Sequence, residues 1–450
     1  MFETLKNAFK VKEIRIKIYW TLLFLLLYRV GCYIPVPGIG DQLFSNTTLE
    51  NTSYLNIMSM MTGGSLTNGT LFAMGIGPYI NASIIMQLLA VAIPPLERLS
   101  KQGEEGRKKI AAYTRYLAIF LAIVQSIGIL VSYGELASGN ASLSTIIAGG
   151  KTDGNTWFPD FLSYVIIILF YTAGSAITIW IGERITDYGI SNGISLLIFA
   201  GIIASAGIFF ANQLAIIFAD GGFDRLNFLW LIIYVLIVVI VFAAIVYVDL
   251  AERKISVQYA KQVKGRKMYG GQSTVIPIKV NANGVMPLIF AFSILTFPEL
   301  IMTLFGWTDA LAWWSTWLGS TSRYPFYAII LSLLIVFFAF FYSQIQFNPE
   351  DISKTIQQNG GFIPGIRPGK PTAEYLKKIS NRLTLFGAIF LALLALLPTV
   401  ILNFLPIIAN GGTGGAFNAT GMLICVSVAL EFNTALESQI MMKNYKGFLK

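Results

Sequence analysis

The chain has 450 residues, of which 55% are apolar and only 12% are charged, and its formal net charge is +9. A soluble domain has about 25% charged residues, so this composition excludes an ordinary soluble fold and is typical of a protein with many membrane spans. The chain has no histidine, which excludes catalytic triads that use imidazole and metal sites with histidine ligands.

Ten segments of the chain are long and apolar enough to cross a hydrocarbon core about 30 Å thick. We predict membrane spans at 18–34, 76–93, 113–133, 161–181, 193–211, 228–248, 285–305, 325–346, 383–402 and 419–438. The sequence therefore predicts an all-α polytopic membrane protein.

Basic residues set the expected orientation of these spans. They precede the first span and fill the loops after spans two, four, six and eight, whereas the opposite loops hold only Lys151, Arg225 and Arg323. By the positive-inside rule, both chain termini are expected in the cytoplasm. Spans one to five (residues 1–212) and spans six to ten (213–450) then form two inverted halves, because five is an odd number.

The first span carries Arg29 well inside its apolar run. A charged side chain at this depth needs a partner and is a candidate for a functional role. A structural explanation, either snorkelling or an ion pair with Glu431 of the last span, is favoured, and a part in transport is the alternative.

The segment 53–71, which follows the first span, is a poor membrane helix. Gly63, Gly64 and Ser65 interrupt an apolar run that is rich in methionine, and a regular apolar helix follows from Ile76. Interrupted backbone at membrane depth is tolerated only where protein or a water-filled cavity surrounds it. A broken half-span before a full span therefore predicts a pore or a binding site.

Two predicted inside loops, 251–284 and 347–382, are longer than a connection needs. In the first loop, the alternating runs ISVQY and TVIPIKV flank a basic tip with glycine, which predicts a cytoplasmic β-hairpin. In the second loop, prolines and glycines hold Arg367 at an exposed, rigid turn. Both loops are interpreted as docking surfaces, and the alternative is that inside loops simply collect basic residues.

Six isoleucines lie at comparable depth in four of the predicted spans, and two pairs of them have the four-residue spacing that places both members on one helix face. They are Ile76, Ile80, Ile194, Ile198, Ile289 and Ile424. Branched aliphatic side chains that converge from several helices form a constriction that excludes water when it is narrow. The alternative is that each packs in a core or against lipid, which is the commoner place for an isoleucine in a membrane helix.

Seven long motifs occur in order along the chain: CYIPVPGI, MTGGSL, FAMGIGPYINASIIMQLL, EGRKKIAAYTRY, GISNGISLLIFAGI, QSTVIPIKVNANGVMPLIF and NGGFIPGIRPGKPT. Through them, and over essentially its whole length, the sequence resembles the bacterial SecY protein-translocase channels of the SecY/Sec61 family. The resemblance implies a passive, gated channel that passes unfolded preproteins across the membrane and releases apolar segments sideways into lipid. A bound motor ATPase or the ribosome would supply the energy, and neither catalysis nor a cofactor is implied.

The resemblance also implies roles for individual residues. The segment 53–71 matches the plug, a short helix that blocks the external funnel, with Asn56, Met58, Met60, Met61, Gly63, Gly64 and Ser65. The pore ring matches the six isoleucines named above. The lateral gate matches positions Asn81, Gln87, Asn192 and Phe297.

The expected partners follow from the same resemblance. They are the small membrane subunits SecE and SecG, the SecA motor ATPase, the ribosome, signal sequences and nascent or unfolded preproteins, in the lipid bilayer of a bacterial plasma membrane. Nucleic acid is expected only as ribosomal RNA at the docking loops. The docking residues are Arg253, Lys254, Lys261, Lys264, Arg266, Lys267 and Arg367.

Two other classes of protein share some of these features. A secondary transporter also uses inverted repeats and broken helices, but it usually needs acidic or polar groups near the midplane, and here Glu299 lies beside Pro298 toward the end of a span. An intramembrane enzyme is disfavoured by the lack of histidine and of paired carboxylates within the spans. Both alternatives predict solute uptake or substrate turnover by the purified chain.

Overall fold

The computed structural model of the chain describes residues 6, 8–36, 59, 62–66, 68–100, 102–137, 157–218, 225–259, 262–264, 267–269, 273–281, 284–305, 307–318, 326–404 and 419–448. The described part is mostly helical and packs as two compact units. Unit 1 comprises Met1–Ile232, Ser293–Tyr327 and Phe404–Lys450, and unit 2 comprises Ile233–Phe292 and Ala328–Asn403. Unit 1 draws on both predicted halves of the chain, whereas unit 2 lies wholly within the second half, so these packing units and the topological halves are different divisions.

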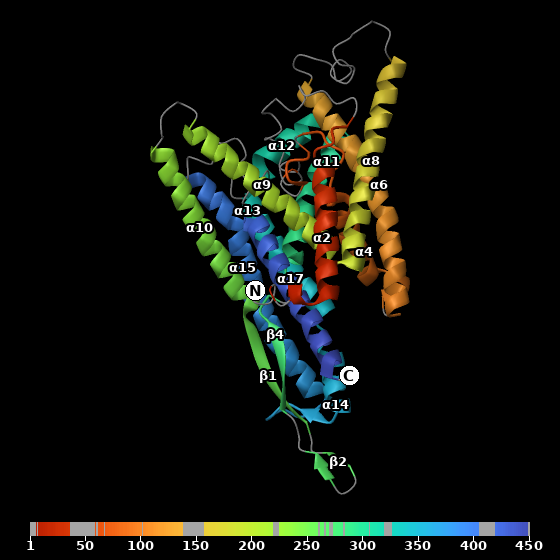
Figure 1. Ribbon diagram of the computed structural model, residues 1–450, viewed down its shortest axis with the longest axis vertical. Helices are drawn as coiled ribbons and strands as arrows, with labels where there is room; N and C mark the ends of the chain where they lie inside the picture. Colours follow the sequence, from red (N-terminus) through yellow and green to blue (C-terminus); the bar gives the residue numbers. More distant parts are fainter. Residues whose placement is uncertain are drawn as a thin grey trace. The chain divides into compact units, whose positions relative to one another are not determined.

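Unit 1 holds most of the long helices (Figure 1). They are α2 (Lys12–Gly31), α4 (Gly77–Ala92), α5 (Pro94–Ser100), α6 (Glu104–Ala137), α8 (Trp157–Tyr188), α9 (Gly193–Phe218), α12 (Thr308–Leu318) and α17 (Ala419–Phe448), together with the start of α10 (Arg225–Leu250) and the end of α11 (Met286–Leu304). Within this unit α8 packs against α2, α6 and α9, and α9 also packs against α17.

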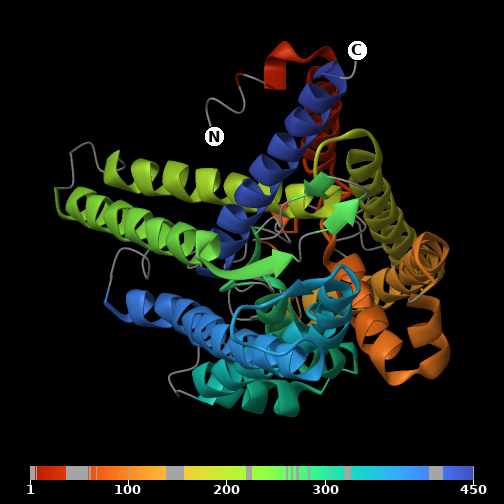
Figure 2. The same cartoon turned by 90° about the horizontal axis from the view of Figure 1, so that it is seen from below.

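A sharp bend separates α4 from α5. The two helix axes differ by 106°, and the break falls at Ile93, which has extended backbone and precedes Pro94 and Pro95. A proline disfavours helical backbone at the residue before it, so the helix ends there. After this bend α6 runs back along α4 (Figure 2). Ala82 of α4 and Ala118 of α6 have no exposed surface, and their small side chains let the helices approach closely.

Unit 2 combines helices with a small sheet. It contains most of α10, the start of α11, α13 (Phe326–Gln346) from Ala328, α14 (Pro349–Gln358), α15 (Lys370–Phe404) to Asn403, and the strands β1 (Glu252–Tyr259), β2 (Gln262–Lys264), β3 (Lys267–Tyr269), β4 (Ser273–Lys279) and β5 (Gly361–Phe362). The main sheet has the strand order β4-β1-β5, and β2 pairs with β3 in a separate two-stranded ladder.

The predicted hairpin is present as β1 and β4. The strands are antiparallel, with Ile255 opposite Ile276 and Val257 opposite Thr274. Pro277 lies in β4, which is an edge strand and can therefore accommodate a residue without a backbone N–H.

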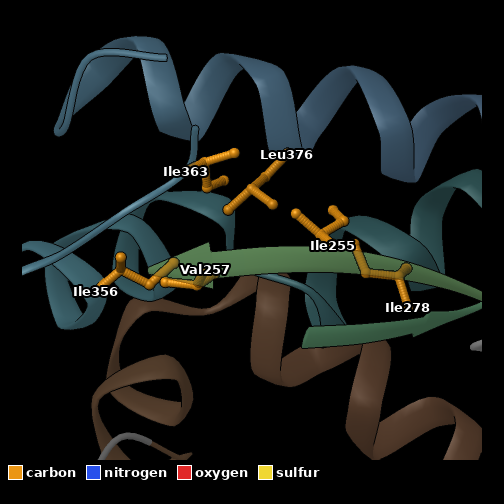
Figure 3. Packing of buried hydrophobic residues seen from close by; sticks show 6 residues of the cluster. All are labelled: Ile255, Val257, Ile278, Ile356, Ile363 and Leu376. Carbon is orange, nitrogen blue, oxygen red and sulfur yellow. The ribbon is translucent and has the colours of Figure 1, made fainter. Parts of the chain in front are cut away.

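The two long loops fold together, which the sequence analysis did not foresee. Strand β5 of the second loop pairs with β1 of the hairpin. A single apolar core joins them, and Figure 3 shows its six buried side chains. Ile255, Val257 and Ile278 come from the hairpin, and Ile356, Ile363 and Leu376 come from the second loop and the start of α15. The predicted docking loops are thus one folded element of unit 2.

Seven helices of the described part are long and apolar enough to cross a membrane, and the bent pair α4–α5 would be an eighth. The first predicted span falls on α2 and the seventh on α11, whose apolar part Met286–Glu299 is shorter. Every predicted span therefore falls on a helix, while the full count of ten remains a prediction.

Candidate functional site

The start of α4 carries the first two ring candidates. Ile76 occupies the N-cap position, and Pro78 follows in the first turn, where its missing N–H costs no helical hydrogen bond. Ile80 lies one turn later, and its N–H donates to the Ile76 carbonyl at 3.0 Å. The Ile76 side chain is buried and that of Ile80 is half-buried, so this helix face is turned toward protein.

The start of α9 carries the next pair. The Asn192 side chain accepts a hydrogen bond from the Ile194 N–H at 3.1 Å, and the Thr186 hydroxyl accepts from the Gly193 N–H at 2.9 Å. These caps satisfy helix donors that lack intrahelical partners and fix the beginning of α9. Ile194 is half-buried here, and Ile198 is buried one turn further on.

The remaining ring candidates belong to α17 and α11. Ile424 is buried in α17, which packs against α9 in the same unit. Ile289 is half-buried in α11 and belongs to unit 2. None of the six isoleucines is exposed in the way that Ile203 of α9 is, and each is buried or half-buried within its own unit.

A series of tight turns, residues 62–66 and 68–75, leads into α4; we call it the turn segment. Four of its glycines have positive φ angles, at Gly63 (68°), Gly64 (82°), Gly69 (57°) and Gly75 (50°). Residues with a Cβ rarely adopt this conformation, which explains why the segment is rich in glycine. Gly63, Gly64 and Ser65 of the predicted plug are part of it, whereas Asn56, Met58, Met60 and Met61 lie outside the described residues.

The turn segment is attached to the extension of α2. The Val36 N–H donates to the Gly69 carbonyl at 3.1 Å, and the Leu71 N–H donates to the Ile34 carbonyl at 2.8 Å. At the end of α2, the Tyr28 ring stacks on the Phe72 ring with their centroids 5.7 Å apart. These contacts fix both the path and the register of the segment.

Helices α8 and α9 also pack against the turn segment. A Cβ on Gly174 of α8 would lie 1.9 Å from the Leu71 carbonyl oxygen, and a Cβ on Gly63 would lie 3.0 Å from the Gly201 carbonyl oxygen of α9. The Ser175 hydroxyl of α8 also donates to the Gly75 carbonyl at 3.4 Å. The interrupted backbone is therefore surrounded by protein, which is what broken backbone at membrane depth requires.

Of the two structural explanations for Arg29, snorkelling or an ion pair with Glu431, the ion pair is not among its contacts in the described residues. Its guanidinium contacts the Gly63 carbonyl and the side chain of Tyr33 rather than Glu431. A sequence does not mark a backbone carbonyl as the acceptor, because every residue carries one.

The four gate candidates have different surroundings. Asn81 is half-buried in α4, and the Gln87 amide donates to the Ser83 hydroxyl of the same helix at 3.1 Å. Phe297 of α11 is 46% exposed. Asn192 is accounted for by its capping of α9, so a second role for it stays a prediction.

The docking candidates belong to the folded element of unit 2. Arg253 and Lys254 are exposed on β1, and Lys254 forms an ion pair with Glu252 at 3.3 Å. Lys264 and Lys267 belong to the β2–β3 ladder, whereas Lys261 and Arg266 lie outside the described residues.

Arg367 is held on a pinned turn, as predicted from its prolines and glycines. Gly365 and Gly369 flank it with φ angles of 84° and 95°. The Thr372 hydroxyl donates to the Arg367 carbonyl at 2.8 Å, and the Ser353 hydroxyl of α14 donates to the Gly369 carbonyl at 2.7 Å. The exposed guanidinium therefore projects from a rigid backbone.

Within the described part of the chain, no three side chains of the metal-ligating types lie together. The arrangement consists instead of buried aliphatic residues, a glycine-rich turn segment and an exposed basic element. Aliphatic side chains of this kind make non-directional apolar contacts and form no hydrogen bonds.

Comparisons with known proteins agree with this description. A family model described as SecY matches residues 70–433. A protein of Streptomyces griseus named "Protein translocase subunit SecY" is 41% identical, with all of both chains aligned. Among solved structures, one described as "The plug domain of the SecY protein stablizes the closed state of the translocation channel and maintains a membrane seal" has a TM-score of 0.61 at 23% identity, covering 94% of this chain and 92% of that one. Sec61 in a canine ribosome-channel complex of the endoplasmic reticulum has a TM-score of 0.56 at 21% identity, with the same two coverages.

Proposed function

Because the chain belongs to the SecY family, we propose that its six buried or half-buried isoleucines form the seal of a protein-conducting channel. The chain is a protein translocase subunit and not an enzyme. It forms the gated passage for unfolded preproteins, and energy comes from a bound partner. The proposal concerns which residues carry out this function.

The observation that best supports this proposal is the position of Ile76. This residue is the N-cap of α4 and directly follows the glycine-rich turn segment, which packs among α2, α8 and α9. A seal of aliphatic side chains forms no directional bonds to its cargo, so it accepts any polypeptide and excludes water when it closes. The turn segment matches the plug and would pack beside this seal.

Replacement of ring residues by serine tests the seal. We expect Ile80→Ser combined with Ile198→Ser to raise the ion leak of reconstituted vesicles about tenfold or more, because a hydroxyl stabilises water in a narrow apolar constriction. Ile203→Ser is the matched control, since Ile203 belongs to the same helix α9 and is 48% exposed. A leak in the double variant no greater than that of the control would contradict the seal.

The membrane topology is part of the same proposal. Ten spans in two inverted halves, with both termini in the cytoplasm of a bacterium, are supported by the helix at every predicted span and by the distribution of basic residues. A lateral gate that includes Asn81, Gln87, Asn192 and Phe297 would let sufficiently apolar segments partition into lipid.

The partners are proposed from the exposed basic element of unit 2. Arg253, Lys254 and Arg367 are exposed on the sheet and the pinned turn, where they fit a SecA-type motor or the ribosome, including its RNA. The similarity to a ribosome-bound Sec61 channel supports the second of these. SecE-like and SecG-like small membrane subunits complete the proposed assembly.

A further inference from the structure

Arg29 is a charged residue in the last turn of an apolar helix, and its partners are unusual. Nη1 lies 3.5 Å from the Gly63 carbonyl oxygen, Nη2 lies 3.4 Å from the Tyr33 hydroxyl, and the guanidinium carbon lies 5.2 Å from the centre of the Tyr33 ring. Arg29 makes no ion pair among the described residues. A guanidinium keeps its charge in any protein environment, and the interactions of this one are with a backbone carbonyl, the Tyr33 side chain and the Cys32 thiol.

The turn segment passes directly against this guanidinium. A Cβ on Gly63 would lie 2.6 Å from Arg29 Nη1, and the φ angle of Gly63 is 68°. Two independent constraints therefore require glycine at this position: the backbone conformation and the closeness of the charged group. The same Cβ would lie 3.0 Å from the Gly201 carbonyl oxygen of α9, so α2 and α9 both border the segment at this point.

Neighbouring residues of α2 meet the same segment with uncharged groups. Tyr28 stacks on Phe72, and the Cys32 thiol is within hydrogen-bonding reach of Ser65. Cys32 is only 3% exposed, so the segment covers it. Arg29 supplies the charged contact of this interface.

We propose that Arg29 is a positioning residue that holds the turn segment in the closed channel; this rests on the proposed role of that segment as the plug. A charged donor strengthens a hydrogen bond to a carbonyl, and more so where water is scarce. A carboxylate partner on the segment would leave an unpaired buried charge whenever the segment moved, which is very costly. With a carbonyl partner, the moving segment carries no charge, and Arg29 keeps Tyr33 as a partner. The contact can therefore break and re-form with each opening.

The thiol of Cys32 offers a readout of this contact. Arg29 also contacts the thiol, and loss of this positive charge would by itself slow alkylation, so a faster reaction reports greater exposure of the thiol. The chain has two cysteines, Cys32 and Cys425, so Cys425→Ala leaves one thiol beneath the turn segment. In the reconstituted translocase, we expect Arg29→Gln to raise the rate at which a membrane-permeant maleimide alkylates Cys32 by about tenfold, because a hydrogen bond to a charged group is lost. Arg29→Lys, which keeps the charge without the planar fork, should give an intermediate rate.

A second variant approaches the contact from the other side. Gly63→Ala leaves Arg29 in place but puts a methyl group where the guanidinium lies, so it should raise the alkylation rate as well. Arg184→Gln is the control: Arg184 of α8 also lies over two aromatic rings, Trp180 and Tyr188, and its ion pair is with Asp187 of its own helix. In this variant Cys32 should be alkylated at the same rate as in the parent. Resistance of the remaining chain to trypsin shows that each variant is folded.

The outcomes separate this proposal from the function on which it rests. Parent-like alkylation in both Arg29→Gln and Gly63→Ala overturns the positioning role, whatever the ring variants do. Faster alkylation in both, with the lysine variant between them and the parent, supports it. Ring variants that fail to leak would overturn the seal and would leave the result of the thiol experiment unchanged.

Discussion

Gly31, at the end of α2, faces the ring of Phe72 without space for a side chain. A Cβ on Gly31 would lie 2.0 Å from an edge atom of this buried ring, which also stacks on Tyr28. The ring cannot move without giving up the stack or the packing of the turn segment. A single hydrogen atom at Gly31 thus permits the contact between helix and segment.

We therefore expect Gly31→Ala to destabilise the protein by about 1–3 kcal/mol, the usual cost of overpacking. The measurement is the midpoint of thermal unfolding in detergent. Gly207→Ala of α9 is the control, because a Cβ there meets nothing within 4 Å and should be neutral or slightly stabilising. Equal midpoints for the two variants would show that Phe72 moves aside at no cost.

Single residues also mark the limit of prediction from this sequence. The glycines of the turn segment could be recognised as breaks in a helix, because glycine and its neighbours carry a local signal. The contacts of Arg29 could not, because its acceptor is the backbone of residue 63 and its ring partner is an ordinary tyrosine. The capping role of Asn192 was missed although it stands directly before a helix, because the family resemblance had already given it a different role.

Among the elements, the hairpin was predicted correctly and its partner was missed. The alternation of ISVQY and TVIPIKV reports one buried face, and the structure places Ile255, Val257 and Ile278 on that face. Strand β5, however, has only two residues, which is too short for any periodic signal. The joint core of the two loops therefore follows from tertiary packing and not from local pattern.

This core gives a prediction about the element as a whole. Leu376 is fully buried near the start of α15 and is one of the six side chains of the core that joins the two loops. We expect Leu376→Ala to cost about 2–5 kcal/mol in local stability and to make the hairpin more sensitive to protease. Leu385→Ala, at a 47% exposed position of the same helix, should leave the digestion rate unchanged. If both variants are digested at the parent rate, the two loops do not support each other.

For the whole molecule, composition and apolar length predicted the class of protein and the positions of its helices. These signals are local and repeated, so they survive uncertainty at the helix ends. The proposed convergence of isoleucines from helices far apart in the chain has no local signal, because an isoleucine facing lipid looks the same in sequence. The resemblance to a family supplied that part of the prediction, and burial supports it without placing Ile289 against the others.

Docking of a partner is a property of the assembled molecule, and Arg367 tests it. Its backbone is pinned by Thr372 and by flanking glycines while its guanidinium is exposed. We expect Arg367→Glu to lower the rate of motor-driven or ribosome-driven translocation about tenfold or more, because it reverses a charge on a rigid contact surface. Membrane insertion of the variant itself should be normal.

The control for this experiment is Lys354→Glu, which makes the same charge reversal on the exposed face of α14 nearby. A loss of equal size in both variants would indicate that only the overall charge of the element matters. A normal rate in Arg367→Glu would remove the docking role of the turn.

The packing of α4 against α6 around Ala82 and Ala118 has a mechanical consequence. Both side chains are fully buried in one cluster with Ile179 of α8, so a displacement of α4 against α6 would leave an unfilled space in this packing. The chain reversal through α5 adds a short tether at one end of the pair. The two helices are therefore expected to move together as one rigid pair. A spectroscopic label on an exposed position of α6 would then report a displacement of α4 without any change to the residues of the proposed seal.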